Sequence, residues 1–395
     1  MTKVSGAVKP GYEQVADAFA AAFAGEPTMG AALAVYAGGE RVVHLWGGYA
    51  DHRTGKPWGE DTASVVFSCT KGLVSIVVAR LVEEGRLDYD APVARYWPEF
   101  AAAGKGSVTV GEALSHRAGL SAPKDDLTPD DIVDWEIVTA ALARQAPLWS
   151  PADGYAYHAI THGWLAGEIV RRVTGQSIGA VFAETIAGPL GADAWIGLPE
   201  AERSRVAHLE VEPALVQLWE DERVKPGPDG TNWLYRAMTL GRALPAELAT
   251  PDGGFNDPRL QAAEIPGAGG IATADALARI WSATVVPTDG IRLIDDDVIA
   301  RATVVQSEGA PVFPAIGPFS RWGMGFQLDS EARPFLTAAG FGHGGAGGQL
   351  AFADPVHDVG FGFITNAMRG PDDTRAGSIV TALRAVLGEG QAARS

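Results

Sequence analysis

The sequence is poor in several features, and each shortage narrows the class of protein. It has one cysteine, Cys69, so an intramolecular disulfide is excluded and the redox compartment stays open. Its 31 basic residues against 48 acidic ones give a formal charge of −17, which makes nucleic acids and anionic membranes poor partners. No apolar run is long enough to span a bilayer, and the N-terminus lacks the pattern of a secretory signal. We therefore expect a cytoplasmic protein.

The chain is well supplied with the residues that a folded core needs. Of its 395 residues, 47% are hydrophobic and 20% are charged, which is typical of a globular protein with one large or two smaller domains. Helical spacing of apolar residues occurs at about 11–24, 68–84, 130–143, 159–174, 273–285 and 373–387. Strand-like runs occur at 31–36, 41–49, 323–328, 349–353 and 359–365.

The order of these elements predicts an α+β fold. Strands near both ends of the chain, with helices between them, indicate an antiparallel sheet flanked by helices, built from residues 1–90 and 266–395. Residues 91–265 are expected to form a mainly helical inserted domain. Its part at 210–265 is rich in Trp, Pro and Gly and is expected to be irregular, with long loops that border a cleft.

The most informative stretch is Ser68-Cys69-Thr70-Lys71. At the start of a helix, Ser68 would lie at the positive end of the helix dipole, with Lys71 one turn further on the same face. A nucleophilic hydroxyl, an amine to take its proton and backbone N–H groups for an oxyanion would then be combined. Cys69 would point about 100° away and is interpreted as a buried filler. Taken alone, the motif is equally typical of a helix cap followed by a solvated lysine.

Two further segments carry candidate chemistry. Tyr157 lies in a turn that leads into a helix; such a tyrosine usually packs, but beside a Ser/Lys pair it is a candidate general base. Which of Lys71 and Tyr157 holds the proton is left open. The run 342–348 is rich in glycine and lacks the Lys-Ser/Thr of a phosphate loop. It predicts a close backbone approach to substrate, with an N–H near Ala346 aimed at an oxyanion, and equally a hairpin that needs positive φ; the two interpretations are compatible.

Two other patterns are set aside. Gly175-Gln176-Ser177-Ile178-Gly179 matches the Gly-x-Ser-x-Gly elbow of α/β-hydrolases, but it follows a helix where that elbow must follow a strand. We interpret Gly175 as a helix C-cap and Ser177 as the next N-cap. His158 and His162 have the spacing of metal ligands on a helix, but no further ligands accompany them, so no metal and no cofactor are predicted.

Together, these motifs resemble the serine β-lactamase and penicillin-binding-protein superfamily, in particular its class C branch. Ser68-Cys69-Thr70-Lys71 resembles its Ser-x-x-Lys, Tyr157-His158-Ala159 its Tyr-x-Asn, and His343-Gly344-Gly345 its Lys-Thr-Gly. Two framework motifs also match, at 114–120 and 269–275, so that the resemblance extends from about residue 12 to 387. It implies a β-lactamase-like fold with Ser68, Lys71 and Tyr157 as catalytic residues. It also implies an oxyanion hole formed by the N–H groups of Ser68 and Ala346, and substrate contacts by His343, Gly344 and Gly345.

The departures from that pattern point to a particular activity. Class C β-lactamases have Asn at the position of Ala159 and Lys at that of His343, where these groups contact the amide and carboxylate of a β-lactam. The pattern here is similar to that of family VIII carboxylesterases. We therefore expect a cytoplasmic serine carboxylesterase that hydrolyses short-chain or small carboxylic esters through an acyl-enzyme. Tryptophan and phenylalanine side chains of the inserted domain are expected to line an apolar pocket.

Other functions are carried forward as alternatives. The same fold supports a β-lactamase, a D-amino-acid amidase or peptidase, or an acyltransferase that uses an acceptor other than water. A non-catalytic binding protein is the alternative from another class, and the joint presence of Ser68, Lys71 and Tyr157 argues against it. The expected partner is a small-molecule ester. The oligomeric state is not indicated by the sequence.

Overall fold

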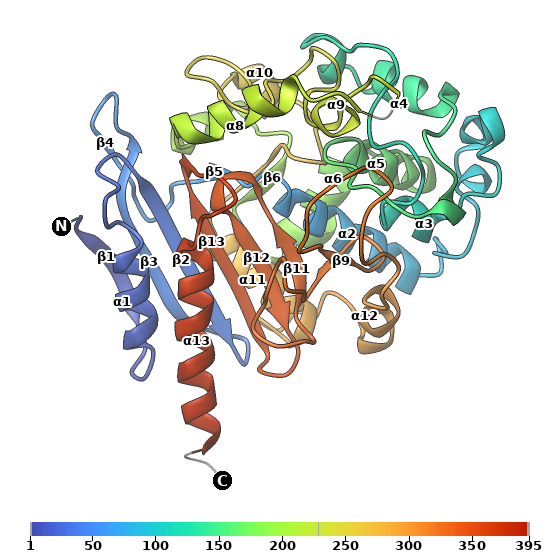
Figure 1. The fold of residues 1–395 in the computed structure, drawn as a ribbon. Coiled ribbons are helices and arrows are strands. Elements are labelled where there is room, and N and C mark those ends of the chain that lie inside the picture. The colour runs from blue at the N-terminus through green and yellow to red at the C-terminus, as the bar shows by residue number, and fades with distance from the viewer. Residues whose placement is uncertain (1, 228, 393–395) are drawn as a thin grey trace.

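A computed structural model describes residues 2–227 and 229–392 and shows an antiparallel sheet at the centre of the protein (Figure 1). Within these residues the strand order is β1-β3-β2-β13-β12-β11-β10-β9, with β4 added beside β3. The strands are β1 (Val4–Val8), β2 (Gly30–Ala37), β3 (Glu40–Asp51), β4 (Lys56–Pro57), β9 (Arg321–Trp322), β10 (Gln327–Leu328), β11 (Phe341–Gly344), β12 (Leu350–Asp354) and β13 (Val359–Thr365).

The centre of the sheet joins the two ends of the chain. β13 pairs with β2 along its whole length, from Thr365 opposite Ala31 to Val359 opposite Ala37. All seven residues of β13 are buried, as is typical of a strand covered on both faces. The predicted strands at 31–36, 41–49 and 359–365 are confirmed. The hairpin between β2 and β3 turns at Gly38 and Gly39, which both have positive φ and so fit a tight two-residue turn.

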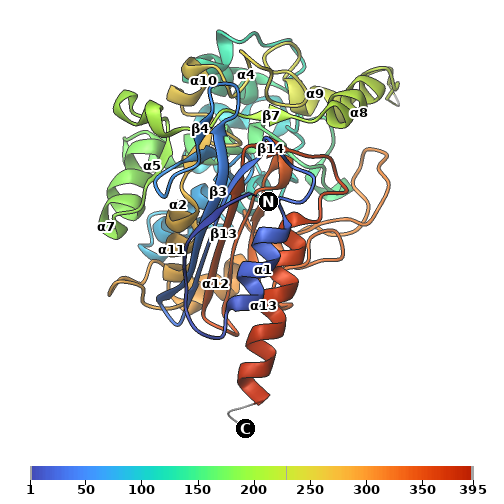
Figure 2. The same cartoon turned by 90° about the vertical axis from the view of Figure 1, so that its left-hand side faces the viewer.

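Helices cover both faces of the sheet. α1 (Glu13–Ala21) and α13 (Arg375–Ala392) lie side by side against one face (Figure 2), where their apolar side chains join a separate core cluster with the strands. α2 (Cys69–Glu83) and α11 (Ala274–Val285) pack on the other side, α11 across β13, β2 and β12, and α2 against β11. The predicted α+β arrangement of an antiparallel sheet flanked by helices is confirmed.

Most of the remaining helices gather beside and above this second face in Figure 1. They are α3 (Val110–Leu114), α4 (Trp135–Arg144), α5 (Thr161–Thr174), α6 (Ile178–Phe182), α7 (Gly188–Leu190), α8 (Pro213–Arg223), α9 (Trp233–Thr239), α10 (Pro258–Ala262) and α12 (Asp296–Ala302). Short strands also pair there: β5 (Ser64–Val65), β6 (Ala194–Ile196) and β8 (Gly270–Ala272) in one sheet, and β7 (Glu210–Val211) with β14 (Ala367–Met368) in another.

The prediction of an irregular segment at 210–265 is wrong, because this stretch contains α8, α9 and α10. Pro213 and Pro258 do not disrupt these helices, because they occupy first-turn positions, where the missing N–H has no helical partner to lose. The side chains of Asn232 and Asp257 cap the starts of α9 and α10 by accepting backbone N–H groups.

The single strand expected at 323–328 is also wrong. The chain instead forms two short strands, β9 and β10, which pair with each other through Trp322 opposite Gln327. Gly325, with φ of +95°, lies in the turn between them and adopts a conformation that other residues rarely take. This hairpin matters for the site below because it extends the sheet beyond β11 toward the helical region.

One continuous core cluster of buried residues includes side chains of the second sheet face, α2, α11 and the helices between 91 and 265. The division of the chain into domains at 1–90 with 266–395 and at 91–265 stays a prediction. None of the described helices combines the length and apolar character needed to cross a membrane.

Candidate active site

The backbone before α2 places Ser68 at the start of that helix. Phe67 has a φ of +46°, which is uncommon for a residue other than glycine. Its side chain is fully buried and meets the ring of Phe255 edge-on at 5.7 Å, so tertiary packing holds this bend in place. α2 begins at Cys69, and Ser68 therefore takes the N-cap position, where the helix dipole and unpaired N–H groups meet.

The structure brings Ser68, Lys71 and Tyr157 together. Ser68 Oγ lies 3.0 Å from Lys71 Nζ and 2.9 Å from the Tyr157 hydroxyl, both within hydrogen-bond distance. Lys71 is on the same helix as predicted, whereas Tyr157 comes from the turn before α5, 89 residues further along the chain. Lys71 Nζ also lies 5.0 Å from the centre of the Tyr157 ring.

Lys71 is fully buried and has no carboxylate partner among the described residues. Its Nζ donates to the carbonyl oxygens of Ala159 and Gly267, each at 2.6 Å. Burial holds the pKa of the Lys71 amine well below its usual value, because a charged ammonium is poorly solvated there. The surroundings therefore favour the neutral amine.

The two carbonyl groups reach Lys71 because two backbone segments run very close together. A Cβ added to Gly267 would lie 2.1 Å from the carbonyl oxygen of Ile160, and one added to Gly163 would lie 1.9 Å from the Gly267 nitrogen. Glycine at both positions is what lets the start of α5 approach the chain before β8. Sequence reasoning missed the role of Gly267, since nothing in a glycine-rich run marks which carbonyl faces a lysine.

Tyr157 is held between aromatic rings. Its ring stacks on Trp322 of β9, with centroids 5.1 Å apart and planes at 19°, and meets the ring of His116 at 4.9 Å. Burial raises the pKa of the Tyr157 phenol above its usual value, with the hydrogen bond to Ser68 acting in the opposite direction. These surroundings keep Tyr157 protonated, as a hydrogen-bond donor to Ser68.

His158 and His162 are engaged by the backbone. His158 Nδ1 bonds to the Ala156 carbonyl at 2.7 Å, and its Nε2 accepts from the Leu120 N–H at 3.1 Å. His162 Nε2 bonds to the Leu114 carbonyl at 3.2 Å. Burial lowers the pKa of His158 to about 4 and that of His162 to about 3, so both rings are neutral at ordinary pH. Residues 2–227 and 229–392 contain no cluster of histidine, cysteine and acidic side chains arranged to hold a metal ion.

His343 lies at the end of β11, beside Ser68 in the wall of the cavity. Its Nδ1 bonds to the Gly344 carbonyl at 2.6 Å, whereas its Nε2 is buried without a hydrogen-bond partner among the described residues. Burial holds the pKa of His343 well below the usual histidine value. The ring is thus a neutral group, unlike the ammonium that the related Lys-Thr-Gly motif supplies.

A cavity of about 400 Å³ opens onto Ser68 Oγ. Tyr157, His343, Gly344, Gly345 and Ala346 line it together with Ser68, so all the predicted site residues except the buried Lys71 share one space. Ala346 begins a short 3₁₀ turn after β11. Neither the Ser68 N–H nor the Ala346 N–H donates a hydrogen bond within the described part of the chain, which leaves both available to a ligand.

Several residues of this cavity were not indicated by the sequence. Gln327 of β10 accepts the Gly344 N–H at 2.9 Å and so ties β11 to the hairpin. Phe319 and Trp322 give the wall its apolar character, and Arg333 gives it a cation. No motif surrounds any of them; they reach the site only because β9 and β10 fold back onto β11.

The patterns set aside on sequence grounds are confirmed as structural. Gly175 ends α5 with a φ of +78°, and the Ser177 hydroxyl accepts the Ala180 N–H at the start of α6. Cys69 is fully buried; its thiol donates to the His343 carbonyl at 3.1 Å, and burial raises its pKa to about 12. Such a thiol is a poor nucleophile.

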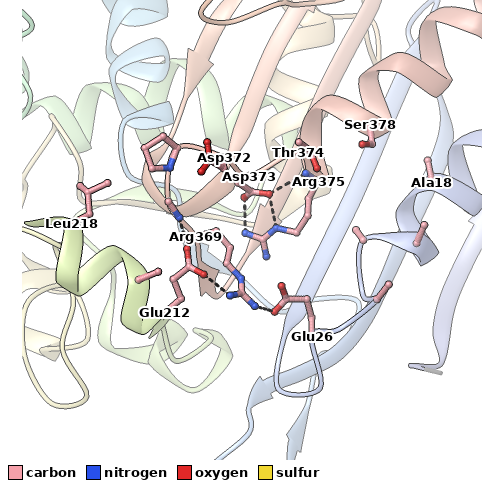
Figure 3. Close-up of a pocket in the computed structure, with 16 residues that line it drawn as sticks. Ala18, Glu26, Glu212, Leu218, Arg369, Asp372, Asp373, Thr374, Arg375 and Ser378 are labelled. Carbon is pink, nitrogen blue, oxygen red and sulfur yellow. Dashed lines mark hydrogen bonds and ion pairs between the residues drawn. The ribbon is translucent and has the colours of Figure 1, made fainter. Parts of the chain in front are cut away.

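A second hollow, of about 530 Å³, lies between α1, α8 and the chain before α13 (Figure 3). Arg369 bonds to both Glu26 and Glu212 there, and Arg375 bonds to Asp373 at 2.7 Å. Both arginines of this hollow thus pair with carboxylates, and Arg369 links the segments that carry Glu26 and Glu212. The candidate active site is the cavity at Ser68.

The sequence profile of the Beta-lactamase family matches residues 15–385. The chain belongs to this family. It is similar to Esterase/beta-lactamase LipL of Mycobacterium tuberculosis, with 35% identity over 378 residues that cover 93% of this chain and 84% of the relative. The predicted superfamily and its β-lactamase-like fold are confirmed.

Two solved structures are similar over nearly the whole chain. A family VIII carboxylesterase has a TM-score of 0.84 and 37% identity, covering 97% of this chain and 100% of that one. A penicillin-binding protein homologue from Caulobacter crescentus has a TM-score of 0.84 and 38% identity, covering 98% of this chain and 100% of that one. The protein is therefore a serine hydrolase. Because an esterase and a penicillin-binding protein homologue are equally similar, the choice of substrate depends on the site.

Proposed function

We propose that this member of the Beta-lactamase family is a carboxylesterase that hydrolyses small carboxylic esters through an acyl-enzyme on Ser68. The observation that carries the proposal is the placement of Ser68 Oγ within 3.0 Å of Lys71 Nζ and 2.9 Å of the Tyr157 hydroxyl, at the wall of a cavity. A nucleophile next to a base and a second proton-transfer group is the arrangement that acyl transfer requires.

Lys71 acts as the general base in this proposal. A neutral amine has two N–H donors and one lone pair. The carbonyls of Ala159 and Gly267 take the two donors, so the lone pair is left for the Ser68 hydroxyl. As Ser68 Oγ bonds to the ester carbonyl carbon, its proton passes to Lys71 Nζ, and the carbonyl electrons move to the oxygen.

Tyr157 relays a proton rather than removing one. Its raised pKa keeps the phenol protonated, which argues against a phenolate base. When the tetrahedral intermediate breaks down, the leaving alkoxide takes the Tyr157 proton, and the Lys71 ammonium replaces it. Water then attacks the acyl-enzyme with the same groups in reverse order, which restores Ser68 and releases the acid.

The developing oxyanion is assigned to two backbone donors. The N–H groups of Ser68 and Ala346 have no partner in the described protein and belong to residues that line the cavity. Donors fixed before the reaction stabilise the charge without reorganisation. His343, Gly344 and Gly345 would position the bound ester along the end of β11.

Two features favour an ester over a β-lactam or a peptide. Ala159 supplies no side-chain amide, and His343 is neutral, so the groups that hold the amide and carboxylate of a lactam in class C enzymes are absent from these positions. The cavity is lined instead by apolar side chains such as Phe319, Trp322 and Met238, which suit a small acyl or alkyl group.

The deciding experiment compares kcat/KM for 4-nitrophenyl butyrate and for nitrocefin. We expect ready turnover of the ester and little or none of the lactam, with ester turnover abolished in Ser68→Ala. Ser177→Ala is the matched control, because it changes an exposed serine in a Gly-x-Ser-x-Gly sequence and should retain full activity.

Faster turnover of nitrocefin would mean that other groups have replaced Asn and Lys, and that the protein is a β-lactamase; its similarity to a penicillin-binding protein homologue makes this the second candidate. Retention of most esterase activity by Ser68→Ala would contradict the proposed mechanism altogether.

A further inference from the structure

The active-site cavity continues into a larger one, and a single cation stands where they meet. The larger cavity has a volume of about 830 Å³ and lies next to the cavity of about 400 Å³ at Ser68. Five residues line both cavities: Met238, Leu248, Arg333, Gly345 and Ala346. An ester that extends from the Ser68 cavity into the larger one passes Arg333.

The guanidinium of Arg333 has no partner. Nothing in residues 2–227 and 229–392 accepts a hydrogen bond from it or forms an ion pair with it, and its Nε is buried without an acceptor. A buried donor that lacks an acceptor is unfavourable, and more so when it is charged. The Nε atoms of Arg80, Arg321 and Arg369 are buried without an acceptor too, but those three guanidinium groups form hydrogen bonds or ion pairs through their other nitrogens or with a carboxylate, whereas that of Arg333 forms none with a described residue.

The position of Arg333 is built into the fold. A tight turn links its backbone to Ser330, through N–H to O bonds of 3.1 and 3.2 Å, and the buried residue Phe335 anchors the loop by an N–H bond to Asp329 at 2.8 Å. The guanidinium lies over the backbone of β11: a Cβ added to Gly344 would be 3.0 Å from Arg333 Nε. Glycine at this position thus makes room for the guanidinium.

The charge of the surroundings also singles out Arg333. The whole chain carries a formal charge of −17. Arginines elsewhere, such as Arg369 and Arg375, form ion pairs with carboxylates. No acidic side chain lines the cavity at Ser68. In the larger cavity, Asp373 is bound to Arg375, and Glu247 forms no ion pair with Arg333. On the side of the Ser68 cavity, an anionic ligand would meet a cation and no competing carboxylate.

We propose that Arg333 binds a carboxylate carried by the ester substrate, so that the enzyme prefers acidic esters, such as monoesters of dicarboxylic acids, over neutral ones. This inference rests on the proposed esterase function. The planar guanidinium donates two parallel N–H bonds to one carboxylate, and a single guanidinium matches a single negative charge. The carboxylate belongs to either the acyl or the alcohol part of the ester, since both cavities adjoin Arg333.

The test uses pairs of esters that differ only in charge. For the acyl side, the pair is mono-4-nitrophenyl adipate and its methyl ester; for the alcohol side, it is 3-carboxyphenyl butyrate and its methyl ester. We expect the wild type to prefer the acid in at least one pair, mainly through a lower KM. In that pair, Arg333→Met should reduce kcat/KM for the acid by roughly 10- to 100-fold, the usual effect of losing a charged hydrogen-bond partner.

The neutral ester should change by less than about threefold in Arg333→Met, and Arg333→Lys should recover part of the preference because it keeps the charge but not the planar fork. Arg144→Met is the matched control: Arg144 is exposed at the end of α4, forms no hydrogen bond or ion pair with a described residue, and lies outside both cavities. It should leave both substrates unchanged. In the wild type, added salt should weaken the preference for the acid.

Two results would overturn the inference while leaving the esterase function in place. One is ready hydrolysis of 4-nitrophenyl butyrate with no preference for the acid in either pair. The other is an equal loss for acid and neutral ester in both Arg333→Met and Arg333→Lys, which would assign Arg333 a structural role. Failure of the wild type to hydrolyse any of these esters would reject both proposals together.

Discussion

Lys71 in the cavity and Lys105 in the helical region are both fully buried, and each places its amine near the face of an aromatic ring. The Lys71 amine lies 5.0 Å from the centre of the Tyr157 ring, and the Lys105 amine lies 5.3 Å from that of Phe100. Burial lowers the pKa of both lysines. We nevertheless expect the two lysines to have different roles.

The difference lies in what accepts their hydrogen bonds. Lys105 Nζ donates to three carbonyl oxygens, those of Ala102, Ala143 and Gln145, at 2.8, 2.9 and 2.5 Å. An ammonium has three N–H donors, so all of them are used and the charged form is fully satisfied. Burial lowers its pKa to about 8 only, and the group ties two chain segments together.

Lys71 has two carbonyl acceptors, and the third direction points to the hydroxyl of Ser68. The two carbonyls accept both N–H donors of a neutral amine, and the lone pair of its nitrogen is left to accept the proton of the Ser68 hydroxyl. Burial by itself therefore does not make a lysine a base. The two lysines differ in their third hydrogen-bond partner, which is a carbonyl for Lys105 and the Ser68 hydroxyl for Lys71, and a nucleophile beside the amine is what makes Lys71 the candidate base.

Among the changes that test this comparison of the two lysines, the largest effect on turnover is expected from Lys71→Met. The change removes the base while keeping a side chain of similar length, and kcat/KM for 4-nitrophenyl butyrate should fall by roughly 10³- to 10⁴-fold. Labelling of Ser68 by a fluorophosphonate probe should slow in parallel. Lys105→Met is the matched control, because it removes the other buried amine. Similar losses of turnover per folded molecule in both variants would erase the contrast between the two regions.

A smaller loss is expected from Tyr157→Phe. The variant keeps the ring that stacks on Trp322 but lacks the hydroxyl that relays the proton to the alcohol, so kcat should fall by about 10²-fold with little change in KM. Lys71 would still activate Ser68. A loss as large as that of Lys71→Met, with the alkaline pH dependence of a phenolate, would instead identify Tyr157 as the base.

Lys105→Met should affect stability and leave turnover within about twofold. Three carbonyl groups lose their donor, one in a buried bond and two in part-buried bonds, which should lower the free energy of unfolding at neutral pH by about 1–3 kcal/mol, measured by urea denaturation. The folded pKa of about 8 lies below the unfolded value of about 10.4, so the unfolded chain binds more protons between these pH values.

The wild type should therefore gain stability from Lys105 as the pH rises through that window, by at most about 3 kcal/mol, and Lys105→Met should lack this gain. Comparison of the two proteins at each pH cancels the contribution of Lys71. An equal increase in the free energy of unfolding of the wild type and of Lys105→Met would show that the titration of Lys105 does not cause the increase.

Much of the fold was predictable because its signals are local. Alternation of apolar residues located β2, β3 and β13, and helical spacing located α2 and α11, since each pattern depends only on neighbours along the chain. The same local rules misjudged 210–265, where prolines at first-turn positions begin helices, and 323–328, where Gly325 allows a turn. Both errors concern proline or glycine: proline disrupts a helix interior but can begin a helix, and glycine interrupts a strand but allows a turn between two strands.

The candidate site divides in the same way. The spacing of Ser68 and Lys71 is a property of one helical turn, so the sequence by itself determined that these two side chains face each other. The protonation of Lys71 was decided only by tertiary structure, because burial sets it, and the carbonyls of Ala159 and Gly267 that contact the amine lie 88 and 196 residues away along the chain. Arg333 likewise reaches the cavity only through the folding of its loop onto β11. Desolvation and charge act through space, and a linear motif records neither.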